Sequence, residues 1–232
     1  MSLRREAYRE YLATPLSPSA TAHIVGNASR ELKEVPLKWY NIFRTLGKGG
    51  FGYEAGKRIV VKELSIQPTV DDPSKIEARL VCEIEVTAGA RQRRSTAGML
   101  ISADMCDGMG MLHQGCMAFL MDEYDTPLRY QECSSRFNLN SRHRGSAIAL
   151  LVMNIHEGGE NSIGVSQTLN ILYHAAAPLG TRLRIINRSV TAGGEMDCCR
   201  SEIWDLDKHR LIVSVTQIQM APSGLFPSFE GA

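Results

Sequence analysis

The sequence predicts an α+β fold in which an antiparallel sheet wraps around one central helix. The first observation is the run from Cys116 to Met121, which is apolar on every side, as expected of a helix buried all round. The second is the alternation of apolar and polar residues from Glu77 to Val86, which is typical of a half-buried antiparallel strand. The third is a succession of strand-like segments, separated by turns, in the last third of the chain.

The length of 232 residues suits one domain with an extension. We predict a helical N-terminal extension over residues 1–50 and the main domain over residues 51–232. Within the extension, one helix is expected at Arg4–Leu12. A second begins near Ser29 and stops before Pro36, which starts a further helical segment. The extension is expected to cap an open face of the core, with a lid over a substrate channel as the alternative.

Seven segments are predicted to be strands: Arg58–Gln67, Glu77–Val86, Ala147–Ile155, Ile163–His174, Thr181–Val190, Met196–Trp204 and Arg210–Met220. Ala147–Ile155 is continuously apolar, which indicates a central strand. Ile163–His174 is expected to alternate, with Val165, Leu169, Ile171 and Tyr173 on one face. Residues 87–99 and 130–145 are polar and are predicted to be surface loops.

Composition and charge exclude several classes of protein. The net charge of +1 gives no reason to expect nucleic acid or an anionic membrane as a partner. The N-terminus lacks the apolar segment of a signal peptide, and every apolar run is too short to span a membrane. The six cysteines lack the spacing of a metal site or a disulfide framework. We therefore expect reduced thiols in a cytoplasmic protein without metal or cofactor.

A glycine-rich segment, Leu46–Gly52, has the spacing of a protein-kinase nucleotide loop, and Lys62 follows on a predicted strand. A kinase also needs His-Arg-Asp and Asp-Phe-Gly motifs, and the sequence contains neither. The segment is therefore interpreted as a connection into the first strand.

The stretch from Cys106 to Thr126 carries the candidate site. A glycine-punctuated turn begins at Asp107, Leu112-His113-Gln114-Gly115 follows, and the apolar run ends at Asp122. This pattern resembles the core of the hot-dog-fold acyl-CoA thioesterases of the phenylacetate type, and the resemblance extends over residues 76–220. In the family pattern an Asn stands at the position of Asp107 and a Gly at that of Gln114. Both departures fall on positions where the family does its chemistry.

The resemblance implies a hot-dog fold and thioester hydrolysis. It implies that the amide of Gln114, beside His113 and Gly115, donates to the oxyanion at the start of the helix. Asp122 would be the base or nucleophile, acting at the site of a partner subunit in a homodimer or homotetramer. Ser166 matches a position that orients water, and Thr126, one turn after Asp122, is a further candidate.

Each candidate also has a simpler structural role. His113 could cap the helix, Ser166 could be a structural strand residue, and Asp122 could be a buried acid satisfied by hydroxyls. If the backbone at Gln114 needs a positive φ, the donor is misplaced, and otherwise the side-chain amide adds a donor. Asp107 could cap the helix, or it could share a proton with Asp122 and favour acid–base chemistry.

Basic residues in the predicted loop over residues 87–99 suggest a binding site for coenzyme A. Arg91, Arg93 and Arg94 are candidates for contacts with its phosphates. Glu195, by contrast, takes a place where relatives commonly carry a cation, and it would repel phosphates. An acyl group on a carrier protein, or a free small molecule, is therefore the alternative substrate.

Three classes of function remain open. The first is hydrolysis of an acyl-CoA or a carrier-bound acyl thioester. The second is proton-transfer chemistry by a dehydratase, isomerase or cyclase of the same fold, and the third is a non-catalytic binding or scaffold protein. Thiol release from a panel of acyl thioesters distinguishes the first class, whereas ligand binding without turnover favours the third. The sequence does not specify the acyl group.

Overall fold

The computed structural model describes residues 10–46, 53–87, 92–94, 100–102, 105–122, 145–158, 165–192 and 196–220. The helices are α2 (Pro18–Thr21), α3 (Arg30–Leu46), α4 (Tyr53–Gly56), α5 (Gln114–Asp122) and α6 (Gly145–His156). The strands are β1 (Val60–Pro68), β2 (Ile76–Glu85), β3 (Gln92–Arg94), β4 (Leu100–Ser102), β5 (Val165–Tyr173), β6 (Arg182–Thr191), β7 (Met196–Asp205) and β8 (Arg210–Met220).

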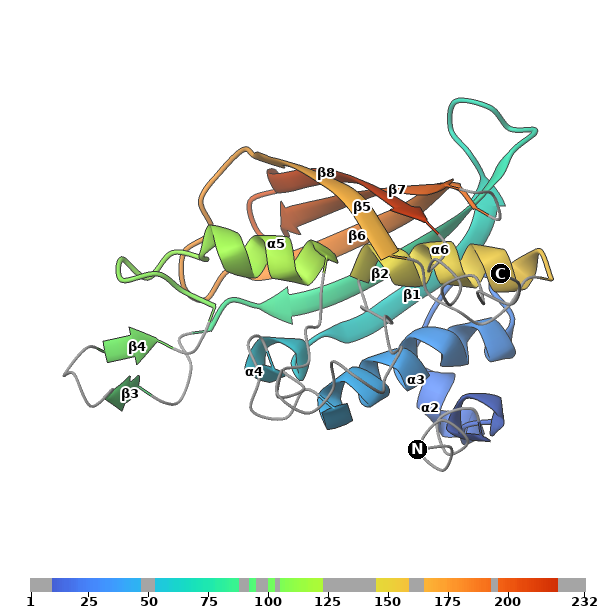
Figure 1. Ribbon diagram of the computed structural model, residues 1–232, viewed down its shortest axis with the longest axis horizontal. Helices are drawn as coiled ribbons and strands as arrows, with labels where there is room; N and C mark the ends of the chain where they lie inside the picture. The colour runs from blue at the N-terminus through green and yellow to red at the C-terminus, as the bar shows by residue number, and fades with distance from the viewer. Residues whose placement is uncertain are drawn as a thin grey trace, which may run out of the picture.

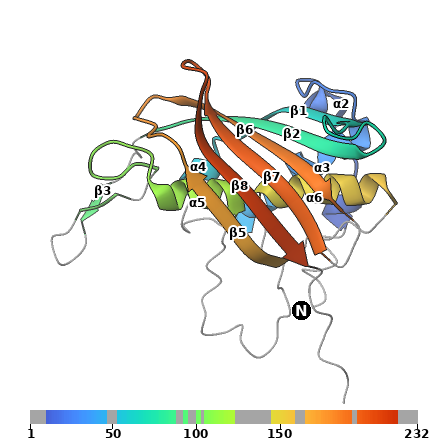
Figure 2. The same cartoon turned by 90° about the horizontal axis from the view of Figure 1, so that it is seen from above.

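Six strands form one antiparallel sheet in the order β1-β2-β6-β7-β8-β5. Helices α5 and α6 lie roughly end to end across one face of this sheet (Figures 1 and 2). The sheet therefore wraps around a central helical layer, which is the hot-dog arrangement and confirms the predicted α+β fold class. The six strands occur within a few residues of their predicted positions.

The inner face of the sheet, which faces α5 and α6, supplies much of the core. On β2 the predicted apolar face is confirmed, because Leu80, Cys82 and Ile84 are buried. The opposite face is not uniformly exposed: Glu85 is exposed, but Val81 and Glu77 are buried. Other core residues of the inner face and the two helices are Leu183, Ile185, Ile203, Val213, Val215, Met117, Leu120, Met121, Ile148, Leu151 and Val152. Burial of this apolar surface is the main force that holds the helices against the sheet.

The prediction of a central strand at Ala147–Ile155 is wrong, because this segment is helix α6. All six residues from Ile148 to Met153 are buried, which a helix achieves only when it is covered on every side. A continuous apolar run has neither the period of a strand nor that of an amphipathic helix, so periodicity cannot distinguish them. Helix α6 packs on β6, β2 and β7 and continues the central layer that α5 begins.

The prediction that Pro36 separates two helical segments is also wrong, because α3 continues through it. Proline removes one hydrogen bond from the helix interior. The apolar stripe of Leu32, Val35, Trp39 and Ile42 is buried on both sides of Pro36, and this packing compensates for the lost bond. The stripe belongs to the same core as the sheet. Where the extension ends and the main domain begins, near residue 50, stays a prediction.

Residues 24–28 form a strap along the outer edge of β1. Val25 N donates to Lys62 O, Leu64 N donates to Val25 O, and Ala28 N donates to Leu64 O, at 2.9, 3.0 and 3.3 Å. The Asn27 side chain bonds both backbone groups of Ile66. The strap therefore occupies backbone groups that an edge strand would otherwise leave open.

The basic segment after β2 contains more structure than the predicted loop. Gln92–Arg94 pairs with Leu100–Ser102 as a two-stranded ribbon, β3–β4, set apart from the main sheet (Figure 1). The loop prediction is therefore wrong for residues 92–94. Arg91 and the predicted loop at 130–144 lie outside the described residues, as do most of the glycine-rich segment and the predicted start of the first helix.

No helix within the described ranges is both long enough and apolar enough to cross a membrane.

Candidate active site

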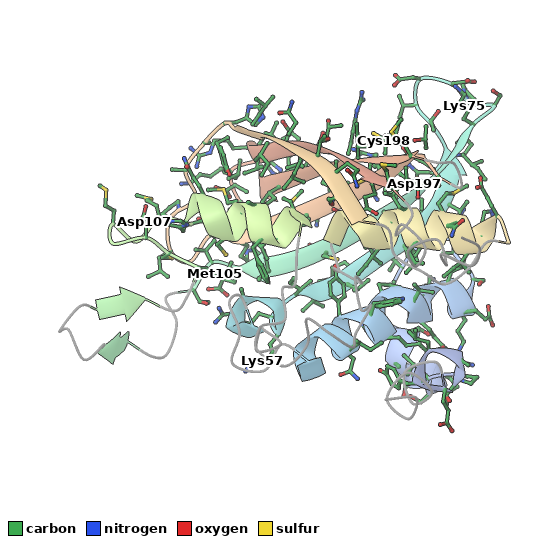
Figure 3. All side chains as sticks on the ribbon, in the orientation of Figure 1. Lys57, Lys75, Met105, Asp107, Asp197 and Cys198 are labelled. Atoms are coloured by element: carbon green, nitrogen blue, oxygen red, sulfur yellow. The ribbon has the colours of Figure 1, made fainter. Side chains whose placement is uncertain are left out.

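The segment before α5 is a tight turn that is bonded on both sides. Asp107 N donates to Met111 O, Leu112 N donates to Ala177 O, and His113 N donates to Met105 O, each at 2.8 Å. Gly110 adopts a φ of +75°, a left-handed conformation that favours glycine. Figure 3 shows Asp107 and Met105 at the end of the molecule where α5 begins. The turn thus fixes the position of the helix N-terminus.

Asp107 is exposed and is bonded within its own turn. Its Oδ1 accepts hydrogen bonds from Met109 N and Met111 N at 2.9 and 3.0 Å. It therefore does not cap α5, because both donors precede the helix, and this part of the prediction is wrong. An asparagine would accept the same two bonds through its carbonyl oxygen and keep an N–H₂ group to donate. Aspartate instead presents a second acceptor oxygen.

His113 caps α5. Gly115 N donates to His113 Nδ1 at 2.9 Å, so the ring accepts at Nδ1 and carries its proton on Nε2. A Cβ added to Gly115 would lie 3.0 Å from His113 Nδ1 and 3.2 Å from Cε1. Glycine at this position therefore leaves room for the imidazole over the first turn. The capping role predicted as the alternative for His113 is confirmed.

Gln114 is the first residue of α5, and its backbone N–H has no hydrogen-bond partner among the described residues. The φ of Gln114 is not positive, because His209 is the single non-glycine residue with positive φ in the described part of the chain. Gln114, which replaces the glycine of the family pattern, therefore does not need a left-handed backbone, and its amide is not displaced for that reason. The opposite side of the residue is held by Tyr173, whose hydroxyl donates to Gln114 O at 3.4 Å.

Asp122 is the last residue of α5, eight residues after Gln114. At a rise of about 1.5 Å per residue the two backbones lie about 12 Å apart along the helix axis. One chain therefore does not bring Asp122 to the Gln114 amide. Thr126 and Glu195 lie outside the described residues, and Arg93 and Arg94 are placed on β3 by their backbones alone.

Ser166 lies near the start of β5, where the strand register shifts between Ser166 and Thr168. Its Oγ accepts a hydrogen bond from Nε2 of Gln217 on β8. The uninterrupted alternation predicted for this strand is therefore wrong. Gln217 was not predicted as a site residue, although a glutamine that follows Val213 and Val215 at alternate positions of the last strand is a signal that could have indicated it.

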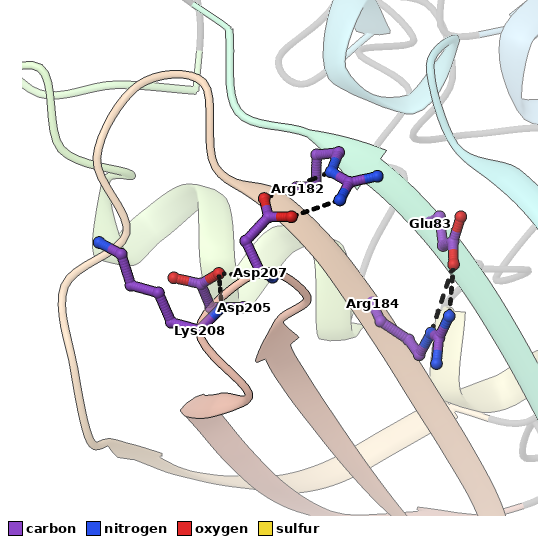
Figure 4. Close-up of polar contacts among 6 residues, drawn as sticks. All are labelled: Glu83, Arg182, Arg184, Asp205, Asp207 and Lys208. Atoms are coloured by element: carbon purple, nitrogen blue, oxygen red, sulfur yellow. Dashed lines mark hydrogen bonds and ion pairs between the residues drawn. The ribbon is translucent and has the colours of Figure 1, made fainter.

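The outer face of the sheet carries pairs of opposite charge rather than an anion-binding cluster. Arg184 donates to Glu83 at 2.8 Å, and Arg182 pairs with Asp207 (Figure 4). The hydrogen bond and charge of Arg182 lower the pKa of Asp207. Because each of these arginines is paired with a carboxylate, the arginines are poorly suited to bind the phosphates of a coenzyme.

Five cysteines lie within the described ranges. Cys82, Cys106, Cys116, Cys198 and Cys199 form no disulfide bonds. Burial raises the pKa of the Cys82 thiol to about 12, despite a contact of 3.6 Å with Tyr40 Oη. Such a thiol does not ionise near neutral pH and is unsuited to act as a nucleophile.

No protein-family model matches this sequence, and no curated protein matches it at a significant level. The structure is similar to solved structures of the thioesterase superfamily. Thioesterase superfamily member 2 from zebrafish is 18% identical, over 79% of this chain and 96% of that one, with a TM-score of 0.48. The mouse protein of that name is 18% identical, over 78% and 96% of the two chains, with a TM-score of 0.44. A hypothetical thioesterase from Streptococcus pneumoniae, solved with coenzyme A, is 15% identical over 61% and 79%, with a TM-score of 0.40. Because these TM-scores are below 0.5, the assignment of the hot-dog fold depends on the strand order and helix positions of this chain.

Proposed function

We propose that the protein hydrolyses acyl thioesters at a site that begins at the N-terminus of α5. The observation that carries this proposal is the backbone N–H of Gln114, an exposed residue at the first position of the helix, which has no partner among the described residues. A helix N-terminus adds a favourable dipole for negative charge. Such a donor stabilises the oxyanion that forms when a thioester carbonyl is attacked.

The neighbouring residues hold this donor in place. His113 caps the next amide, and Tyr173 contacts the carbonyl of Gln114, so the first turn is fixed from two sides. In the proposed reaction Asp122 removes a proton from water, and the water oxygen adds to the carbonyl carbon. The carbon–sulfur bond then breaks, and the thiolate leaves and takes up the proton that Asp122 removed from the water.

The separation of about 12 Å between Gln114 and Asp122 along one helix requires a second chain if both act on one substrate. The two edges of the sheet differ in a way that favours such a dimer. The strap covers the edge of β1, whereas β5 is the other edge strand and exposes Leu172 (59%) and Tyr173 (41%). We propose that β5 faces a second copy in a homodimer, or in a homotetramer built from such dimers.

The acyl group is proposed to be presented on coenzyme A or on a carrier protein. Arg91, Arg93 and Arg94 would supply contacts to the phosphate groups common to both carriers, and Glu195 would oppose them. A cytoplasmic location, inferred from the sequence, agrees with such substrates.

Proton-transfer chemistry is not carried forward as a second function. It depended on Asp107 as a partner acid of Asp122, and the Asp107 carboxylate instead accepts two amides of its own turn. These two hydrogen bonds give Asp107 a role in the turn that needs no catalytic proton.

The test removes the proposed donor without removing the helix. Proline is well tolerated at the first position of a helix and has no N–H, so Gln114→Pro deletes the backbone donor together with the glutamine side chain and retains the helix. Gln114→Ala is the matched control, because it removes the side chain and retains the N–H. With a panel of acyl thioesters we expect thiol release from the wild type and Gln114→Ala, and a loss on the order of 100-fold in kcat for Gln114→Pro. Equal activity of the two variants would remove the Gln114 amide from the mechanism.

A further inference from the structure

A glutamine is fully buried in the middle of the sheet, where packing alone would favour an apolar residue. Gln217 on β8 is 0% exposed, and its neighbours on the same face of that strand include Val213 and Val215. Burial of a carboxamide is unfavourable unless its donor and acceptor both find partners. Nε2 of Gln217 donates to Ser166 Oγ on β5, and Oε1 accepts from Cys199 Sγ on β7 at 3.4 Å. The side chain therefore spans the inner face between two other strands and ends on Ser166.

A β-bulge independently directs Ser166 to the same face. Ser166 pairs with Gln219 and Leu169 pairs with Gln217, so β5 has one more residue than β8 between these two pairs. In a regular strand, residues three apart point to opposite faces. The extra residue places Ser166 and Leu169 on the face that carries Gln217. Bulges are common beside active sites, where they redirect a side chain.

We propose that Gln217 is a positioning residue for Ser166 in the thioester site, an inference that rests on the proposed function. An N–H donated to Ser166 Oγ occupies one lone pair of that oxygen, so the hydroxyl hydrogen points away from Gln217. Ser166 then donates this hydrogen to one lone pair of the water beside the thioester. The second lone pair of the water oxygen is left to attack the carbonyl carbon. Donation from Gln217 also polarises the hydroxyl and strengthens it as a donor.

The first test is a double-mutant cycle on kcat. Gln217→Met removes the donor and retains a side chain of similar length that suits a buried position. We expect Gln217→Met and Ser166→Ala each to lower kcat on the order of 10-fold with little change in KM. The double variant should be no slower than Ser166→Ala, because Gln217 acts through Ser166. Losses that multiply in the double variant, or a wild-type kcat for Gln217→Met, would overturn the proposal.

Ser201→Ala is the matched control for loss of a buried hydrogen bond on the same face. Ser201 Oγ donates to Asn187 Oδ1 at 2.8 Å and has no bond to Ser166. This variant should keep the wild-type kcat, even if its melting temperature falls as far as that of Gln217→Met. If the methionine variant does not fold, Gln217→Leu takes its place in the cycle.

A second readout does not depend on turnover. In a Ser166→Cys variant, the N–H of Gln217 should stabilise the thiolate and lower its pKa relative to the same thiol in Ser166→Cys/Gln217→Met. Alkylation rates at residue 166 across pH, followed by peptide mass spectrometry, measure this difference. A wild type that cleaves no acyl thioester, together with a lowered thiol pKa, refutes the proposed function and supports the contact. Equal thiol pKa values overturn the positioning role whatever the wild-type activity.

Discussion

Gly26→Ala is expected to be one of the most damaging single substitutions outside the site, because glycine is needed where the strap lies against the edge of β1. A Cβ at this position would lie 2.2 Å from Leu64 O and 2.6 Å from Ser65 Oγ, and the φ of Gly26 is +100°. Backbone oxygen cannot move aside as a flexible side chain can, so the strap must leave the edge of β1. Departure breaks the three backbone hydrogen bonds of Val25, Leu64 and Ala28, which at roughly 1 kcal/mol each amounts to a loss of about 3 kcal/mol.

The unfavourable φ for an L-residue costs about 1–2 kcal/mol if the strap stays in place, in addition to the overlap. We therefore expect the free energy of unfolding to fall by about 3–4 kcal/mol. For a chain of this length that corresponds to a decrease in melting temperature of roughly 10 °C. An exposed β1 edge should also promote association beyond the wild-type assembly, because it offers unpaired backbone groups to another chain.

Urea unfolding and light scattering measure the two effects. Gly108→Ala is the matched control, because a Cβ there meets nothing within 4 Å and its φ is not left-handed. The reasoning is refuted if Gly26→Ala loses no more stability than Gly108→Ala.

Three further predictions concern the extension and the turn. Glu34→Gln should lower stability by about 3 kcal/mol at pH 7, because it leaves Lys38, 3.0 Å away and equally buried, without its charge partner. Burial raises the pKa of Glu34, but the hydrogen bond from the Leu16 amide and the hydrogen bond and charge of Lys38 together lower it by more. The pKa of this carboxyl therefore lies below its ordinary value of 4.5. This carboxylate therefore stabilises the fold above about pH 4.5 and loses its effect as the pH falls through its folded pKa, so urea unfolding of wild type and variant should converge in acid. Asp107→Asn should preserve the turn and the melting temperature, add a donor beside the site and raise kcat for thioester hydrolysis, and an unchanged kcat would confine residue 107 to the turn. Gly115→Ala should displace the His113 ring and lower kcat with little loss of stability, because alanine favours the helix, and unchanged kinetics would show that the cap is not needed.

The parts of the fold with a clear period could be predicted from sequence. On β2, Leu80, Cys82 and Ile84 alternate with charged residues, and Val81 is the exception on the charged side. α6 could not be recognised, because a segment buried on every side has no polar face to reveal its period. The continuation of α3 through Pro36 depends on packing against the sheet, which no local signal reports.

The site divides in the same way. The cap formed by His113 could be predicted from sequence, because it depends on the local chemistry at the start of a helix. The contact between Gln217 and Ser166 joins residues 51 positions apart and depends on a bulge that alternation cannot show. Gly26 likewise owes its importance to β1, a strand that follows it by more than 30 residues. Distant contacts of this kind become visible only when the sheet is assembled.

Subunit complementation tests most directly the central claim that two chains share one thioester site. Gln114→Pro lacks the proposed donor and Asp122→Asn lacks the proposed base, so each alone should be inactive. After unfolding and refolding of an equal mixture, half of the dimers contain one chain of each kind. One of their two sites then combines an intact Gln114 amide with an intact Asp122. The account predicts recovery of about one quarter of the wild-type thiol-release rate. A refolded mixture as inactive as its parents, with mixed dimers demonstrated by mass spectrometry, would contradict it.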